Sequence, residues 1–270
     1  MINSLNLRFL IALPPLLGSA MAASSVTYDF NSSSSGDLFE GAGVSGWFQN
    51  NSNPSAFGQT FPLAYVSATD FGSGSSNSAH LGTQFANTPD NSDTTLTGSL
   101  SSVNPSNTMV ASFSMAILDN AADSFEGRDG FSVALKTTAG QEAATIGFSP
   151  TAGDNESWDV SVGVNGSTST TPLQISASTG YSFYINSSHT GTTFSYGNGA
   201  GTATNVLSSV GAINDLDTVG FIAFTHDPLA DVGTSANTLA IDNVNVQIPE
   251  PSPSLLMVLS AGLLAIRRRR

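Results

Sequence analysis

The amino-acid sequence predicts an all-β fold, an antiparallel β-sandwich that takes up most of the chain. Short runs in which apolar and polar residues alternate recur along the sequence, which is the pattern of half-buried strands. Clusters of Gly, Asn, Asp, Ser and Pro separate these runs and are typical of turns. No convincing amphipathic helix of three turns and no repeat of fixed period is present, so we expect roughly ten or more short strands in two packed sheets.

The individual strands differ in how clearly the sequence marks them. The strongest runs are 109–117, 131–135, 144–148, 158–164 and 219–224, with weaker candidates at 28–30 and 96–100. Residues 219–224 are apolar on both faces, which favours a strand inside a sheet. Residues 181–186 and 193–196 form a predicted hairpin with His189 in its turn. Segments 31–62 and 70–93 are expected to be loop-rich.

The last run changes phase partway along. Its apolar residues stand first at odd and then at even positions: Leu239, Ile241, Val244, Val246 and Ile248. Because side chains alternate between the faces of a strand, one inserted residue at Asp242–Asn243 would return both sets to the core. This pattern predicts a β-bulge, and the alternative is a strand that changes from two-sided to one-sided burial.

Residues 1–22 have the features of a secretory signal peptide. A polar start with Arg8 precedes an apolar stretch from Phe9 to about Leu17, and Ala20 and Ala22 supply the small residues that signal peptidase requires. We expect a signal helix that is cleaved after Ala22. A buried N-terminal helix is the alternative.

The C-terminal residues 249–270 combine three features. Pro249, Glu250 and Pro251 end the predicted domain at residue 248, because proline cannot continue a strand ladder. An apolar run, 255–266, is expected to form a short transmembrane helix. It is followed by Arg267, Arg268, Arg269 and Arg270, which the positive-inside rule keeps in the cytoplasm.

This tail resembles the PEP-CTERM sorting signal of Gram-negative bacteria, on Pro249-Glu250-Pro251, the apolar segment and the arginine block. The resemblance implies recognition by an exosortase-type enzyme and removal of the tail. It also implies passage through the inner membrane to the cell surface or extracellular matrix, often beside exopolysaccharide. An ordinary tail anchor is the alternative.

Charge and composition exclude several classes of function. The chain carries a net charge of −13 and no cysteine. Arg128 and Lys136 are the only lysine or arginine residues between the two ends. Such a domain repels nucleic acid, anionic lipid and acidic polysaccharide unless a divalent cation intervenes. Thiol and disulfide chemistry are excluded.

The domain 23–248 is similar to carbohydrate-binding jelly rolls and concanavalin-A-like lectin domains. The likeness lies in Val26–Phe30, Gly46–Trp47 and Leu239–Val244. It implies that the first and last strands are neighbours and that Asp29 and Asp242 hold a structural calcium ion. These short segments do not identify a ligand.

Few side chains stand out as candidates for chemistry. Trp47 and Tyr184 are candidate stacking platforms for a sugar, although core packing is the commoner role of such aromatics. Asp154, Glu156 and Asp159 lie close together, and a turn before a strand explains them better than a catalytic pair does. No histidine has metal-ligand spacing and no catalytic residue is assigned.

These observations predict an exported, non-catalytic surface or matrix protein with a lectin-like sandwich, for which glycan binding is one expectation. Two other functions stay open. One is a secreted glycan-active hydrolase with an unrecognised carboxylate pair, and the other is a purely structural envelope protein. Composition and pattern do not separate a glycan-binding protein from a structural one.

Overall fold

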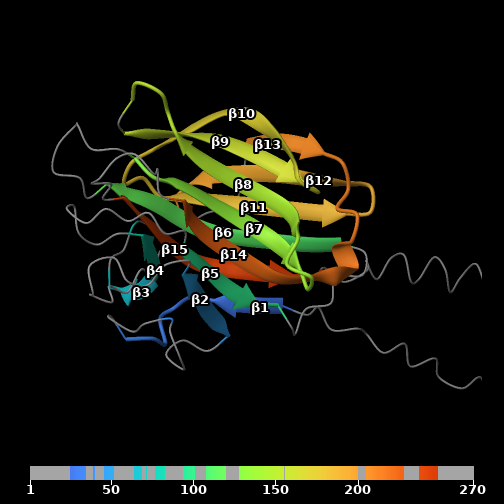
Figure 1. The fold of residues 1–270 in the computed structure, drawn as a ribbon, viewed down its shortest axis with the longest axis horizontal. Helices are drawn as coiled ribbons and strands as arrows, with labels where there is room; N and C mark the ends of the chain where they lie inside the picture. The colour runs from blue at the N-terminus through green and yellow to red at the C-terminus, as the bar shows by residue number, and fades with distance from the viewer. Residues whose placement is uncertain are drawn as a thin grey trace, which may run out of the picture.

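The structure is a computed structural model that describes residues 25–34, 39, 46–51, 64–68, 71, 77–82, 94–100, 108–119, 128–154, 156–199, 205–227 and 237–248. These residues form fifteen β-strands and a 3₁₀ turn at Leu216–Thr218. The strands lie in two antiparallel sheets that face each other, so the predicted sandwich is confirmed (Figure 1).

The two sheets differ in the order of their strands. Sheet A runs β13 (Asn205–Val210), β12 (Gly191–Asn198), β11 (Tyr181–Ser188), β6 (Thr108–Asp119), β15 (Asn237–Gln247), β4 (Ser78–Gly82) and β3 (Ala64–Ser67), and β1 (Ser25–Tyr28) also pairs with β15. Sheet B runs β10 (Ser167–Ser176), β9 (Ser157–Val164), β8 (Glu142–Pro150), β7 (Gly130–Thr137), β14 (Val219–Asp227), β5 (Thr94–Ser99) and β2 (Trp47–Asn51).

The core lies between the sheets and uses the apolar face of each strand. On β9, Trp158, Val160 and Val162 are buried, whereas Asp159 between them is exposed. On β14 the neighbours are β7 and β5, so the strand lies inside sheet B as its two-sided apolar pattern predicted. Phe183 of sheet A meets Phe148 of sheet B at a centroid distance of 5.4 Å. Alternation of period two therefore predicted the main core strands correctly.

The predicted bulge is present in β15. Asp242 pairs with Ser114 and Asn245 with Ser112, so β15 holds one residue more than β6 between these pairs. The apolar residues on both sides of it are all fully buried: Leu239, Ile241, Val244 and Val246. Asn243 has a φ of 50°, the left-handed conformation that an asparagine tolerates better than most residues.

The bulge also marks a change of partner along one side of β15. Residues 238–241 pair with β4, and residues 244–247 pair with β1. The first and last strands of the domain are therefore neighbours, as the likeness to lectin-type jelly rolls implied. The bulge, at residues 242–243, therefore lies between the part of β15 that pairs with β4 and the part that pairs with β1.

Several strands were not predicted. Strand β2 lies within segment 31–62 and β4 within segment 70–93, both of which were expected to be loop-rich. Residues Ser78–Gly82 of β4 are buried on both faces, so they show no alternation. Strand β10 is polar and mostly exposed, and its sequence therefore lacks an apolar face.

The predicted signal helix and sorting tail lie outside the described residues, as do Ala20, Ala22, Pro249 and the four terminal arginines. Within the part of the chain that the structure describes, no helix is long and apolar enough to span a membrane.

Candidate functional site

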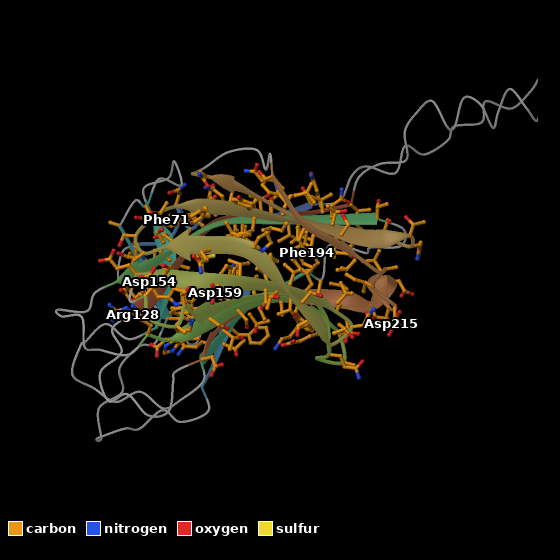
Figure 2. The ribbon with its side chains drawn as sticks, turned by 90° about the horizontal axis from the view of Figure 1, so that it is seen from above. Phe71, Arg128, Asp154, Asp159, Phe194 and Asp215 are labelled. Carbon is orange, nitrogen blue, oxygen red and sulfur yellow. The ribbon has the colours of Figure 1, made fainter. Side chains whose placement is uncertain are left out.

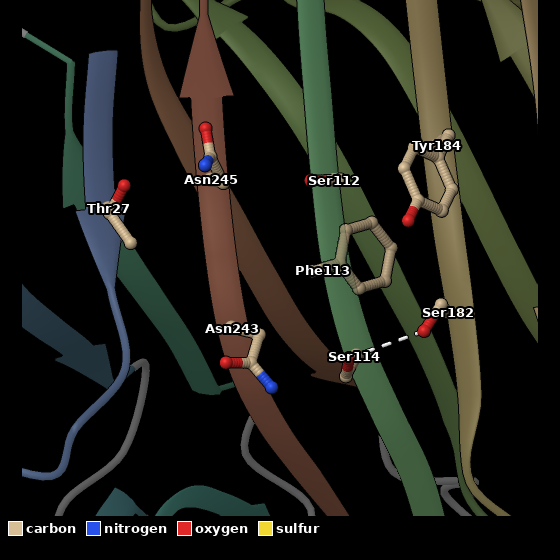
Figure 3. Close-up of a pocket in the computed structure, with 8 residues that line it drawn as sticks. All are labelled: Thr27, Ser112, Phe113, Ser114, Ser182, Tyr184, Asn243 and Asn245. Carbon is tan, nitrogen blue, oxygen red and sulfur yellow. Dashed lines mark hydrogen bonds between the residues drawn. The ribbon is translucent and has the colours of Figure 1, made fainter. Parts of the chain in front are cut away.

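A pocket of about 340 Å³ lies on the outer face of sheet A. Four strands supply its lining, and Figure 3 shows them side by side in the order β1, β15, β6 and β11. We call this pocket the sheet A groove. Its lining consists of Thr27, Ser112, Phe113, Ser114, Ser182, Tyr184, Asn243 and Asn245.

Strand alternation places the hydroxyl groups of β6 and β11 in the groove. Phe113 and Phe183 point into the core, so their neighbours Ser112, Ser182 and Tyr184 point outward. Tyr184 was predicted to face outward, and its side chain is half-buried in the groove wall. The serines could have been found from the same signal, because they are the polar positions of an otherwise apolar run.

The β-bulge brings two amide side chains to the same face. Asn243 takes the left-handed conformation, which restores the alternation so that Val244 and Val246 are buried and Asn245 faces out. On the other side of β15, Thr27 pairs in register with Asn245. The two asparagines therefore stand between Thr27 and the serines of β6 (Figure 3).

Hydrogen bonds hold part of this lining in place. The hydroxyl oxygens of Ser114 and Ser182 lie 3.3 Å apart across β6 and β11. Ser182 Oγ lies 2.6 Å from the carbonyl oxygen of Gly199, to which it donates. Asn245 Oδ1 is buried and accepts no hydrogen bond from any described residue. A buried acceptor of this kind is costly unless a ligand or water supplies a donor.

The chemistry of the groove is polar but uncharged. The described residues of its lining offer hydroxyl groups, amide groups and one phenol ring, and none of them carries a carboxylate, ammonium or guanidinium group. Hydroxyl and amide groups both donate and accept hydrogen bonds, and an aromatic ring adds an apolar surface for stacking. The arrangement suits binding of a polyhydroxylated ligand.

The prediction that Trp47 is a second stacking platform for a sugar is wrong, because its ring is part of the core. Its side chain is only 4% exposed, and it packs against Tyr28 at 4.9 Å and Phe224 at 5.9 Å between ring centroids. The exposed aromatic of β2 is its neighbour Phe48, which points to the outer face of sheet B. Which of these two adjacent aromatic residues faces the core depends on how the short strand β2 is oriented in the sheet, and the sequence alone does not reveal this.

The two aspartates predicted to bind calcium differ in environment. Asp29 is exposed, and its Oδ1 accepts a hydrogen bond from the backbone N–H of Asn31 at 3.2 Å. Asp242 is completely buried at the bulge. The described residues bring no group of three or more acids and histidines together. One exposed and one enclosed carboxylate fit a shared calcium ion poorly, and calcium stays a prediction that chelation can test.

The acids at the start of β9 form the predicted turn. Asp154 accepts hydrogen bonds from the hydroxyl of Ser157 and from the backbone N–H of Glu156, and these bonds lower the pKa of Asp154. Asp159 accepts a hydrogen bond from Gln174 on β10 at 2.8 Å. Asp154 lies toward one end of the sandwich and Asp215 at the other end (Figure 2). Asp154 and Asp159 are therefore engaged locally, and Asp215 lies far from Asp154.

Two histidines have buried roles that the sequence did not reveal. His226 Nε2 lies 2.8 Å from Asp129 Oδ2, and both side chains are fully buried. His80 lies between Tyr65, whose hydroxyl is 3.3 Å from Nδ1, and Ser78, whose hydroxyl is 3.0 Å from Nε2. Burial lowers the pKa of His80 to about 4. Neither histidine lines the sheet A groove.

Comparison with known proteins identifies the type of fold but does not assign the chain to a family. No family model and no curated protein matches the sequence. The chain is similar in structure to the catalytic domain of a glycoside hydrolase family 131 protein from Coprinopsis cinerea, with a TM-score of 0.57 and 11% identity over 82% of this chain and 92% of that one.

Two further solved structures have lower TM-scores. The CBM2 module of the evolved Dit protein of Lactobacillus casei BL23 phage J-1 has a TM-score of 0.49 and 14% identity over 83% of this chain and 96% of that one. Basic winged bean lectin with Tn-antigen has a TM-score of 0.48 and 13% identity over 84% and 100%. At such identities the likeness concerns the fold alone, a jelly-roll sandwich.

Proposed function

We propose that this chain is an exported, non-catalytic surface or matrix protein that binds glycan in the sheet A groove. The observation that carries the proposal is the groove lining, in which uncharged amides and hydroxyls surround the half-buried ring of Tyr184. Sugars present hydroxyl groups along their edges and apolar C–H faces, so both parts of the lining have a counterpart in the ligand. The jelly-roll fold is compatible with this role but does not by itself assign it.

The lining favours binding over hydrolysis at this groove. Hydrolysis of a glycosidic bond requires two carboxyl groups that face the sugar about 5–9 Å apart. Among the described residues, none of those that line the groove carries a carboxyl group. The similar fold of a glycoside hydrolase catalytic domain keeps hydrolysis as the second candidate, to be tested directly on whatever glycan is bound.

The two ends of the chain support export and sorting. We propose that signal peptidase removes residues 1–22 and that an exosortase-type enzyme recognises Pro249, Glu250 and Pro251. The motif, the apolar segment and the arginine block occur in the order that the PEP-CTERM resemblance requires. Sorting to the cell surface would place the groove beside exopolysaccharide.

The proposal is tested by applying the full chain to a glycan array, together with a Tyr184→Ala variant. We expect binding to one group of related glycans and its loss in the variant. A matched control is Phe48→Ala, which removes the 48% exposed aromatic of the opposite sheet. Release of reducing ends from a bound glycan would favour the hydrolase, and no binding to any glycan would refute the proposal.

A further inference from the structure

We infer that the sheet A groove selects an uncharged polysaccharide and takes a linear stretch of several sugar units laid across its strands. This inference rests on the proposed function and adds the chemical class and the length of the ligand. Three features of the groove carry it, namely a buried acceptor, the placement of the cations and the span of the lining.

The first feature is the buried oxygen of Asn245. Its Oδ1 accepts no hydrogen bond from a described residue, so a ligand that turns this amide toward the groove and satisfies the oxygen must donate a hydrogen bond to it. A sugar hydroxyl does so, whereas an ionised carboxylate or a sulfate group only accepts hydrogen bonds. An anionic group placed beside this oxygen would bring two acceptors together and would be rejected.

The second feature is the placement of the positive charges. Between residues 23 and 248 the sequence has two lysine or arginine residues, Arg128 and Lys136. Arg128 is only 6% exposed, and Lys136 lies on β7 of the opposite sheet. Neither lines the groove, so neither supplies a counter-charge to an anion bound there, within a chain that carries a net charge of −13. The uncharged hydroxyls of a neutral sugar avoid this cost.

The third feature is the span of the lining from Thr27 on β1 to Tyr184 on β11. These strands are separated by β15 and β6, and three inter-strand spacings amount to roughly 14 Å. A single sugar ring would contact only part of this lining. An internal stretch of a polymer would reach Tyr184 and the asparagines at once.

The ligand class is tested with immobilised polymers and the full chain. The uncharged probes are laminarin, galactomannan and xyloglucan, and the anionic probes are alginate and polygalacturonate. The exopolysaccharide of the host serves as a matched probe before and after chemical reduction of its uronic acids to neutral sugars. We expect the reduced polymer and at least one uncharged probe to bind at least tenfold more tightly than the anionic polymers. Tighter binding to the anionic polymers would overturn the inference.

Two substitutions at Asn245 test the role of its oxygen. Asn245→Leu removes the acceptor, and Asn245→Asp keeps an acceptor but adds a negative charge. For an uncharged ligand we expect the larger loss with leucine, at least tenfold, and the smaller loss with aspartate. An anionic ligand would reverse this order. Asn186→Leu, at an exposed position of β11 outside the groove lining, controls for the added apolar surface.

Ligand length and the role of Tyr184 separate this inference from the proposed function. Affinity should rise by at least tenfold from a monosaccharide to a tetrasaccharide of the polymer that binds. Equal affinity for both would contradict the linear stretch. If Tyr184→Ala abolishes binding but the bound polymer is anionic, only the inference fails. If Tyr184→Ala leaves binding unchanged, the sheet A groove is not the binding site, and the proposed function fails together with the inference.

Discussion

His226 and Asp129 meet inside the sandwich, 97 residues apart in sequence, with Nε2 of the histidine 2.8 Å from Oδ2 of the aspartate. Asp129 is also fixed through its backbone. Its N–H donates to Asn237 Oδ1 at the start of β15, at 3.1 Å, and its carbonyl accepts a bond from Trp158 Nε1 at 2.8 Å. Asp129, which directly precedes β7, therefore links β14 and β9 of sheet B to β15 of sheet A through buried polar contacts.

We predict that Asp129→Ala lowers the free energy of unfolding by about 3 kcal/mol, because it leaves the buried imidazole without its carboxylate. Asp129→Asn keeps an oxygen that can accept from His226 and should cost less. Urea unfolding of both variants measures the difference. A loss below about 1 kcal/mol for alanine would show that the pair contributes little.

The bulge at Asn243 gives a second prediction. Asn243 has a φ of 50°, where a β-branched side chain is strained, so Asn243→Val should destabilise the fold by about 1–3 kcal/mol. Asn243→Gly should be tolerated, because glycine adopts positive φ without strain. Thr193→Val, at a regularly paired position of β12, serves as the control. Equal stability of the two valine variants, measured by thermal unfolding, would contradict the account of the bulge.

Deletion of Asn243 is a sharper form of the same test. Without the extra residue, Val244 and Val246 would move to the outer face and Asn245 to the core. We expect the deletion variant to fail to fold, as seen by loss of a cooperative unfolding transition. A stable deletion variant would mean that burial of Val244 and Val246 does not require the bulge.

Burial of His80 predicts a pH-dependent stability. Its pKa is about 4 in the folded chain and about 6.5 when unfolded, so the folded chain binds fewer protons between these values. The stabilisation is complete above about pH 6.5 and falls as the pH falls toward 4, by on the order of 3 kcal/mol. His80→Gln should flatten this part of the profile, whereas His189→Gln, at an exposed turn, should not. An unchanged slope in His80→Gln would refute the assignment.

The sorting tail is predicted to be absent from the mature protein. The apolar segment before Arg267 is short for a permanent span, which needs roughly 20 residues. Intact-mass spectrometry of the protein from its native host should show a mass without Arg267–Arg270. Replacement of Pro249-Glu250-Pro251 by three alanines should leave the chain unprocessed and membrane-bound. A wild-type mass that retains the four arginines would favour the tail anchor.

How far the sequence predicts this fold depends on whether one face of a strand is buried. Alternation located β6 and β9, and the change of phase in β15 located the bulge. Strand β4 is buried on both faces and β10 is largely exposed, so neither shows a period-two alternation of apolar and polar residues. Period two is a signal of one-sided burial, and strands without it are missed.

The candidate site was predictable only in part. The outward position of Tyr184 follows from the parity of β11 alone. The groove also requires that β1, β15, β6 and β11 be neighbours, and the order of strands in a sheet is set by long-range packing. Contacts such as that between His226 and Asp129 depend on the same long-range order, and residue spacing does not reveal them.

The most direct test of the central claim, glycan binding in the sheet A groove, is the affinity of the Tyr184→Ala variant for the polymer that the wild-type chain binds. Calorimetric titration should give binding at least about tenfold weaker, a loss of about 1.4 kcal/mol, with an unchanged unfolding temperature. The control Phe48→Ala should bind as the wild type does. Equal affinity of Tyr184→Ala and wild type would contradict the account.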